Sequence, residues 1–339
     1  MHVLNGSLGL LTTHGLLGGH LKVSVTLALA ASVRTGERVA ASMPQYKDFP
    51  PGWGHIKVPL SSRRAAIAAL GLYSPCRRRA VWAQWAAGLG IRLFGPFALP
   101  GRRFGWTPVG TREWEELSEA WRRSIGAFDE VAGYSRLQTT RDGMAVLLLR
   151  QGVPVAFVKL RHGDGTSLSN EKLALHAMWN SRPRAFHVPQ PLGDGAAAGW
   201  CYLISAPLPP GPHRPPDAPP IREITEEVAA ALTGLPRPLN MPSHWRPMHG
   251  DFTPWNLRVV RGGSLVLVDW ENAGWGPPGA DEVLYEATFA VLHNRAPERS
   301  GQAEAARFWR ERVPTQEWDT RDRRLAEGLR FVLDRMTEA

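Results

Sequence analysis

Residues 248–256 read MHGDFTPWN, and residues 265–271 read LVLVDWE. The first stretch has the glycine and proline spacing of a loop. The second is an apolar run that ends in acidic residues, which is typical of a buried strand. Residues 261–264, RGGS, have the composition of a hairpin turn. We therefore expect Asn256 and Asp269 to lie side by side at the ends of two paired strands.

Two carboxylates and one carboxamide at these offsets suit phosphoryl transfer. Asp251 lies five residues before Asn256, and Asp269 lies thirteen residues after Asn256. In such a reaction one carboxylate accepts the proton of the attacking hydroxyl, while an amide oxygen and a second carboxylate hold magnesium. The pattern therefore predicts Asp251 as the catalytic base, and Asn256 and Asp269 as the ligands of Mg²⁺.

The motif H-G-D-x-x-x-x-N followed by a hydrophobic run and D-W-E resembles that of the aminoglycoside phosphotransferase and choline kinase-like family. The resemblance covers about residues 130–339. It implies an α+β, two-lobed protein-kinase-like fold with a small antiparallel β N-lobe and a mainly helical C-lobe. It also implies an ATP-dependent transfer of the γ-phosphate to a hydroxyl of a small molecule, such as a sugar, an aminosugar or an envelope saccharide intermediate. In the family, the residue matching Asp281 braces the catalytic loop.

An upstream pair fits the same chemistry. Residues 153–160 read VPVAFVKL, which predicts a strand that carries Lys159 near its end, and a helix is expected over residues 171–179. A strand lysine that faces a carboxylate in the first turn of the next helix positions the α and β phosphates of a nucleotide. Glu171 is the predicted partner. The alternative is an exposed lysine and a glutamate that complements the helix dipole.

The remaining nucleotide contacts are predicted from their positions in the family's pattern. The loop that covers the phosphates is expected at residues 139–143, where Gly143 is the one glycine and the G-x-G-x-x-G motif is missing. Residues 205–208 are the expected hinge between the lobes. Because Pro207 has no N–H, the main-chain donors to adenine are predicted to be Ala206 and Leu208. ATP is the expected donor, and GTP stays open as an alternative.

Positive charge is concentrated in the first third of the chain. Residues 1–110 hold 13 Lys and Arg against 2 Asp and Glu, a net charge of +11. Residues 77–94 predict a basic amphipathic helix, which we expect to pack its apolar face on the neighbouring domain, with weak contact to an anionic membrane surface as the alternative. Nucleic-acid binding is not expected, since no recognition-helix or aromatic strand pattern accompanies the charge. The apolar face consists of Val81, Trp82, Trp85, Ala86, Leu89 and Leu93.

Composition divides the chain into four regions. Two cysteines give no disulfide framework, which favours a cytoplasmic location, with a peripheral position at the inner face of a membrane as the alternative. An apolar run at residues 23–33 weakly resembles a signal peptide, but the long lead before it argues against one. The regions are 1–42, glycine-rich and expected to be disordered or to precede a true start at Met43; 43–130, a basic helical extension; 131–207, the N-lobe; and 208–339, the C-lobe.

Hydrophobic periodicity predicts the elements between these motifs. Three strands separated by turn signals should form a meander that begins the N-lobe: 135–140, 144–150 and 153–160. A fourth strand is expected at 200–204. Helices are expected at 63–73, 77–94, 111–124, 221–235, 281–293, 303–313 and 320–336.

The sequence allows three alternatives to a kinase. His244, His249 and Asp251 could ligate zinc, although their loop context favours the kinase motif. A hydrolase triad of Ser205, His213 and Asp217 lacks a nucleophile elbow. A catalytically weak nucleotide-binding or membrane-recruited regulatory module of the same fold is the alternative from a different functional class.

Overall fold

The computed structural model describes residues 44–51, 55–135, 143–163, 165–209, 211, 213–297, 302–313 and 320–338. The expectations for residues 1–42, and for the part of the phosphate-covering loop before Gly143, lie outside these residues.

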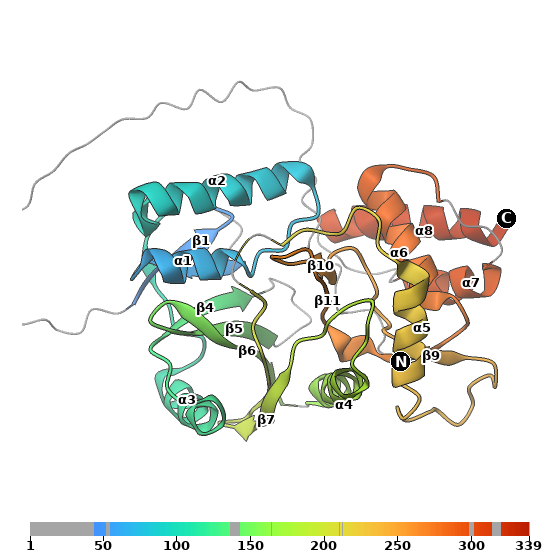
Figure 1. The fold of residues 1–339 in the computed structure, drawn as a ribbon, viewed down its shortest axis with the longest axis horizontal. Coiled ribbons are helices and arrows are strands. Elements are labelled where there is room, and N and C mark those ends of the chain that lie inside the picture. Colours follow the sequence, from blue (N-terminus) through green and yellow to red (C-terminus); the bar gives the residue numbers. More distant parts are fainter. Residues whose placement is uncertain are drawn as a thin grey trace, which may run out of the picture.

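The N-lobe is built on one sheet of eight antiparallel strands (Figure 1), in the order β3-β1-β2-β4-β5-β6-β8-β7. The expected meander is present as β4-β5-β6. Its first strand lies earlier than predicted, at residues 130–135, and residues 136–142 are outside the described part. The strands are β1 Gln45–Phe49, β2 Ile56–Pro59, β3 Phe104–Gly105, β4 Glu130–Ser135, β5 Gly143–Arg150, β6 Val153–His162, β7 Pro191–Ala197 and β8 Trp200–Ser205.

Both faces of this sheet are covered, as the continuous apolar run of β5 requires. Successive side chains of a strand point to opposite faces. Val146 and Leu148 belong to a core cluster with α3 (Thr111–Ile125), whereas Leu147 and Leu149 belong to one with α1 (Arg63–Leu70). The structure thus corrects the expected boundary at residue 131. The preceding segment supplies strands and both covering helices, so the N-lobe begins near Gln45.

Helix α2 (Arg78–Phe94) lies along the outer side of α1 (Figure 1) and packs through the face opposite to the predicted one. Gln84 is buried, and its Nε2 donates to the carbonyl oxygens of Leu70 (2.6 Å) and Tyr73 (2.8 Å). Ile91 is fully buried on the same side. The expectation that the tryptophan-bearing face packs on a neighbouring domain is therefore wrong for the described residues. Its side chains are largely exposed: Trp82 74%, Trp85 58%, Leu89 54% and Leu93 59%.

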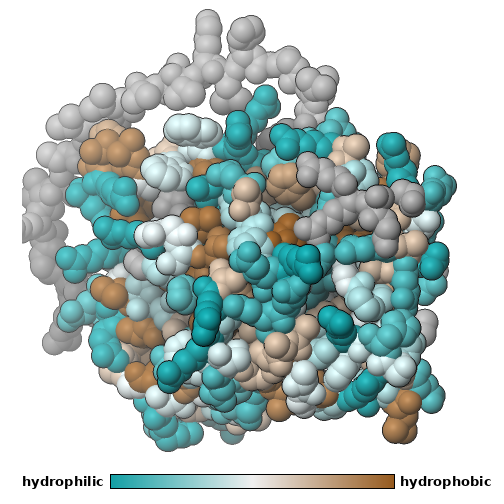
Figure 2. All heavy atoms as spheres, turned by 45° about the vertical axis from the view of Figure 1, so that its right-hand side comes forward, coloured by the Kyte–Doolittle hydropathy of each residue, from teal (hydrophilic) through white to brown (hydrophobic). Residues whose placement is uncertain are grey.

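The C-lobe is mainly helical, as expected, and packs against α4 (Thr166–Ser181) of the N-lobe. Helices α6, α7 and α8 share a core that includes Trp309, Leu329 and Leu333. The face turned forward in Figure 2 is mostly hydrophilic, with hydrophobic residues in small separate patches. The elements are α5 Ile221–Ala231, α6 Ala280–His293, α7 Ala303–Arg312, α8 Thr320–Glu338, and the strand pairs β10 Leu257–Val259 with β11 Leu265–Leu267 and β9 Arg246–Met248 with β12 Gly274–Gly276.

Among the described residues, no helix combines the length and the apolar character that a membrane span needs.

Candidate active site

The hairpin of β10 and β11 brings Asn256 and Asp269 together as predicted. Leu257 pairs with Leu267 in the antiparallel register, and the Val268 N–H donates to the Asn256 carbonyl at 3.1 Å. The Asn256 side-chain amide donates to the carbonyl oxygen of Asp251 (2.9 Å) and to its Oδ2 (3.1 Å). Asp251 is therefore held directly beside the first predicted metal ligand.

The backbone of the loop is fixed by Gly250 and Asp281. Gly250 has φ +77°, and a Cβ there would lie 1.9 Å from the carbonyl oxygen of Asn272, so no other residue fits. The Asp281 carboxylate accepts from the His249 N–H (2.6 Å) and the Gly250 N–H (3.0 Å). Burial raises the pKa of Asp281 to about 7, although both hydrogen bonds lower it. Asp281 thus has the bracing position that the resemblance implied.

The side chain of His249 is part of the same framework. Its Nε2 donates to the Val268 carbonyl at 3.1 Å, and its Nδ1 accepts from the Asp251 N–H at 3.2 Å. Burial lowers the pKa of His249 to about 4, so the ring is neutral near pH 7 and has one donor and one acceptor. Both nitrogens are engaged, and His244 pairs with Glu304 at the surface. The zinc interpretation therefore has no support.

Lys159 joins the two lobes. Its Nζ lies 2.6 Å from Glu171 Oε1 and 2.6 Å from Asp269 Oδ1. Burial alone would lower the pKa of Lys159, but the charges of Asp269, Glu171 and Glu271 raise it above its ordinary value. The predicted lysine–glutamate contact is thus present. Helix α4 starts at Thr166, five residues earlier than expected, so Glu171 lies in the second turn and does not serve the helix dipole.

Asp269 has an unusual backbone conformation, with φ 72° and ψ 63° in the left-handed region. For a residue other than glycine this costs about 1–2 kcal/mol. The next residue, Trp270, is buried and packs against His249 with a ring-centroid distance of 4.5 Å. Strain that surrounding packing maintains in this way is characteristic of functional sites.

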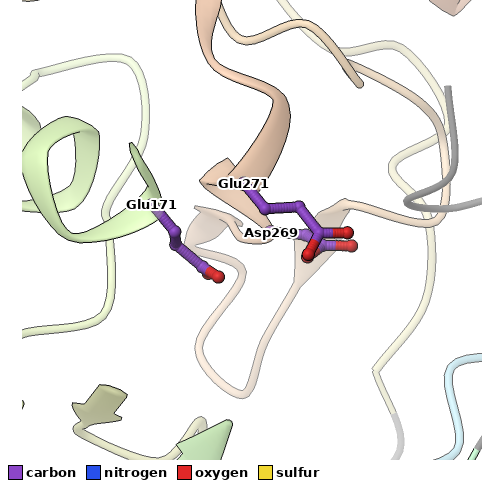
Figure 3. A group of neighbouring side chains, drawn as sticks. All are labelled: Glu171, Asp269 and Glu271. Carbon is purple, nitrogen blue, oxygen red and sulfur yellow. The ribbon is translucent and has the colours of Figure 1, made fainter. Parts of the chain in front are cut away.

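Three carboxylates converge in the cleft (Figure 3), and two of them contact Lys159. Oxygen atoms of Glu171, Asp269 and Glu271 all lie within 4.8 Å of one another. Glu171 projects from α4, while the other two follow β11. Carboxylate oxygens, with an amide oxygen such as that of Asn256, are the donors that Mg²⁺ prefers. The residues present therefore fit the expected metal, and Glu271 joins the two predicted ligands as a candidate.

Two residues of the site were missed by the sequence analysis. Asn170 donates through Nδ2 to the carbonyl oxygens of Glu271 (2.9 Å) and Ala273 (2.8 Å), which ties α4 to the segment after β11. Arg161 donates through Nη2 to Glu271 Oε2 at 2.9 Å. Strand alternation places Arg161 on the same face as Lys159, so this signal was available, whereas no local pattern marked Asn170.

A cleft of about 230 Å³ collects most of the predicted residues. Asp251 is not among its lining residues within the described chain; it is 6% exposed, next to Asn256. The Ala206 N–H donates to the Gln190 carbonyl at 2.7 Å, so the structure corrects its predicted role as an adenine donor. Leu208 stays a predicted hinge donor and lines the cleft. The predicted residues that line the cleft are Gly143, Lys159, Glu171, Ala206, Leu208, Asn256 and Asp269.

The hydrolase interpretation is not supported by the contacts of the described residues. His213 Nε2 bonds to the Pro209 carbonyl at 2.7 Å, and Asp217 pairs with Arg214 at 2.7 Å. Ser205 is the last residue of β8 and is buried. Within the described part of the chain, no hydrogen bond or ion pair joins Ser205, His213 and Asp217.

The N-lobe supplies the Lys159–Glu171 pair, and the C-lobe supplies Asp251, Asn256 and Asp269. Together they define a small-molecule kinase with a protein-kinase-like fold. Residues 213–324 match the family model described as "Phosphotransferase enzyme family". The matched segment contains the catalytic loop, the hairpin and Asp281. This match agrees with the family that the motif resembles.

No curated protein matches the chain in sequence. A protein assigned as fructosamine-3-kinase from Haemophilus somnus 129PT is 12% identical, with a TM-score of 0.41 over 66% of this chain and 97% of its own. The aminoglycoside phosphotransferase APH(3'')-Id from Streptomyces rimosus ATCC10970 is 13% identical, with a TM-score of 0.35 over 65% and 95%. The PknI kinase domain of Mycobacterium tuberculosis is 17% identical, with a TM-score of 0.26 over 63% and 97%. Likenesses of this strength carry no inference about activity.

Proposed function

We propose that this protein transfers the γ-phosphate of ATP to a hydroxyl group of a small molecule. One observation carries the proposal: Lys159 from the N-lobe lies 2.6 Å from both Glu171 and Asp269, beside the Asn256 and Asp251 pair. GTP is the alternative donor, since residues 139–143 lack the G-x-G-x-x-G motif of a phosphate-covering loop.

Each residue has a specific part in the proposed reaction. Lys159, oriented by Glu171, neutralises the α and β phosphates. Asp251 orients the acceptor hydroxyl and takes its proton as the new oxygen–phosphorus bond forms and the bond to the β-phosphate oxygen breaks. Asn256 and Asp269 would hold Mg²⁺, which when bound supplies positive charge to the phosphates. Positioning and charge neutralisation provide most of the rate enhancement.

The acceptor is best sought among neutral or anionic hydroxyl compounds. A polycationic acceptor needs free acidic groups, but two candidates on the C-lobe are occupied within the fold. Glu227 accepts from two backbone N–H groups, and Glu282 accepts from Thr225. This favours a sugar or an envelope saccharide intermediate over an aminoglycoside.

The test is a transfer screen with γ-labelled ATP and GTP in the presence of Mg²⁺. Its panel comprises aminoglycosides, neutral sugars and envelope glycolipid precursors. We expect a labelled organic product with a member of the last two groups. Nucleotide binding without any turnover, with or without acceptors, would support the regulatory module and reject the kinase.

We also propose that α2 contacts an anionic membrane surface. The exposed stripe of Trp82, Trp85, Leu89 and Leu93 is flanked by the exposed Arg78, Arg79 and Arg92. Residues 55–110 contain nine Lys and Arg and no Asp or Glu, which complements anionic headgroups. Interfacial helices combine such an apolar face with basic flanks. The α1–α2 connection also lines the cleft at Leu72 and Ser74, so a lipid-borne acceptor would lie near the site.

The corresponding prediction is salt-sensitive binding to vesicles. Sedimentation should show binding to vesicles that contain anionic lipid, weaker binding to neutral ones, and a loss of roughly tenfold or more in Trp82→Ala/Trp85→Ala, since aromatic burial drives insertion. Phe331→Ala, which removes an exposed aromatic on α8, is the matched control and should bind normally. Vesicle binding that appears only after deletion of residues 1–43 would show that these residues cover the stripe. A dimer that the tryptophan variant abolishes would show that a second copy of the chain covers it. Either result would contradict the proposal.

A further inference from the structure

Arg161 lies beside the phosphate-positioning lysine on the same strand face. It follows Lys159 by two residues in β6 and lines the cleft. Its guanidinium reaches across the cleft to Glu271, with Nη2 and Oε2 at 2.9 Å. Both side chains are mostly buried, at 19% and 3% exposure. The cleft therefore contains a second, largely desolvated cation that the proposed mechanism does not use.

The neighbouring strand leaves room for this arginine. Gly143 pairs with Arg161 in the β5–β6 register. A Cβ on Gly143 would lie 2.2 Å from Arg161 Nη1 and 2.8 Å from its Cδ and Cζ. Any side chain at Gly143 would thus displace the guanidinium. We attribute the glycine to this close approach, which differs from the role expected for it in a phosphate-covering loop.

Glu271 is shared between the arginine and the metal-capable cluster. Its carboxylate lies with those of Glu171 and Asp269, while the same group accepts from Arg161. Lys159 already contacts the other two carboxylates. A nucleoside triphosphate that entered here would offer phosphate oxygens to Arg161. A divalent cation would offer its positive charge to Glu271.

We infer that Arg161 is a second phosphate-binding residue, and that Glu271 holds it in the nucleotide-free protein. The inference deepens the proposed function and rests on it. The planar guanidinium of arginine binds phosphate oxygens in bidentate fashion, which a lysine cannot do. On nucleotide binding Arg161 exchanges Glu271 for the phosphates, and Glu271 becomes available to the cation beside Asp269. No covalent step is involved.

The test is calorimetric binding of magnesium ATP, magnesium ADP and adenosine. Arg161→Met should weaken binding of both phosphorylated ligands by about 10- to 100-fold, the range for a lost charge-assisted hydrogen bond, and leave adenosine unchanged. Arg161→Lys should recover only part of the loss. Arg112→Met removes an exposed arginine on α3 and should bind all three ligands normally.

Gly143→Ala tests the geometry independently. It should weaken ATP binding because it displaces Arg161, and it should add nothing in the Arg161→Met background. Gly234→Ala is the matched control, since a Cβ there meets nothing within 4 Å. Additive losses from the two site variants would contradict the inferred contact.

Glu271→Gln gives a result of opposite sign. It should strengthen binding of metal-free ATP, because Arg161 is released, and the gain should be smaller with Arg161→Met. If wild-type protein binds no nucleotide, the proposed function fails and this inference with it. If wild-type protein binds ATP and Arg161→Met binds it equally well, or loses ATP and adenosine alike, the inference alone is overturned.

Discussion

Asp251→Ala is expected to lower turnover by about 10²–10⁴ while nucleotide binding stays nearly intact, the range for a lost general base. Asp251 bonds to the Asn256 amide and does not line the cleft within the described chain. Its removal should therefore affect the acceptor hydroxyl more than the nucleotide. Turnover is measured with the acceptor found in the transfer screen, and nucleotide affinity by calorimetry.

Two controls separate chemistry from folding. Asp251→Asn keeps a hydrogen-bond acceptor for Asn256 but cannot take a proton, so it should be nearly as inactive as the alanine variant. Asp217→Ala removes an exposed aspartate paired with Arg214 and should be fully active. Turnover of Asp251→Asn at the wild-type level would remove Asp251 from the role of base.

Lys159→Met is expected to lower turnover by about 10²–10³ and to raise the Michaelis constant for the nucleotide, in the range for loss of a preorganised charge. Glu171→Gln should have a smaller effect of the same kind, because the lysine keeps its charge and its contact with Asp269. Steady-state kinetics at varied ATP measure both constants.

Because Lys159 and Glu171 are mostly buried, the same variants should also change the stability of the protein. Glu171 is only 4% exposed, and a buried charge that loses its partner costs about 3–5 kcal/mol. Lys159→Met should therefore lower the melting temperature, and adding Glu171→Gln should restore part of it. Kinetic losses should be less than additive. Lys172→Met, which breaks a half-exposed pair with Asp194, should change neither property. Independent, fully additive effects would show that the two residues do not act as a pair.

The catalytic half of the site could be predicted because it is local in sequence. Asp251, Asn256 and Asp269 fall within nineteen residues that include one hairpin, so spacing and turn composition were enough to place them. Lys159 and Glu171 were found by the change from strand to helix. Asn170 was not, because its partners lie 101 and 103 residues away, on the other lobe. Arg161 was overlooked although it shares a strand face with Lys159, since its partner Glu271 lies 110 residues away.

Non-local pairing also explains what was missed in the fold. Residues 191–197, PLGDGAA, lack β-branched and aromatic residues, yet they form β7 because β8 pairs with them. β1 and β2 lie in the region that was expected to be a helical extension, and their position in the sheet depends on pairing with β4, which is distant in sequence. For α2, periodicity identified an apolar face without showing what covers it. The buried Gln84, which is polar, directs the opposite side inward.

We propose that charges from both lobes form one magnesium–nucleotide site. Calorimetry of ATP binding, with Mg²⁺ and with chelator, to wild-type protein and Asp269→Asn tests it most directly. We expect ATP binding to depend on Mg²⁺ in the wild type and to lose most of this dependence in the variant, because a charged oxygen ligand is gone. Equal, metal-dependent affinity in both proteins would contradict it.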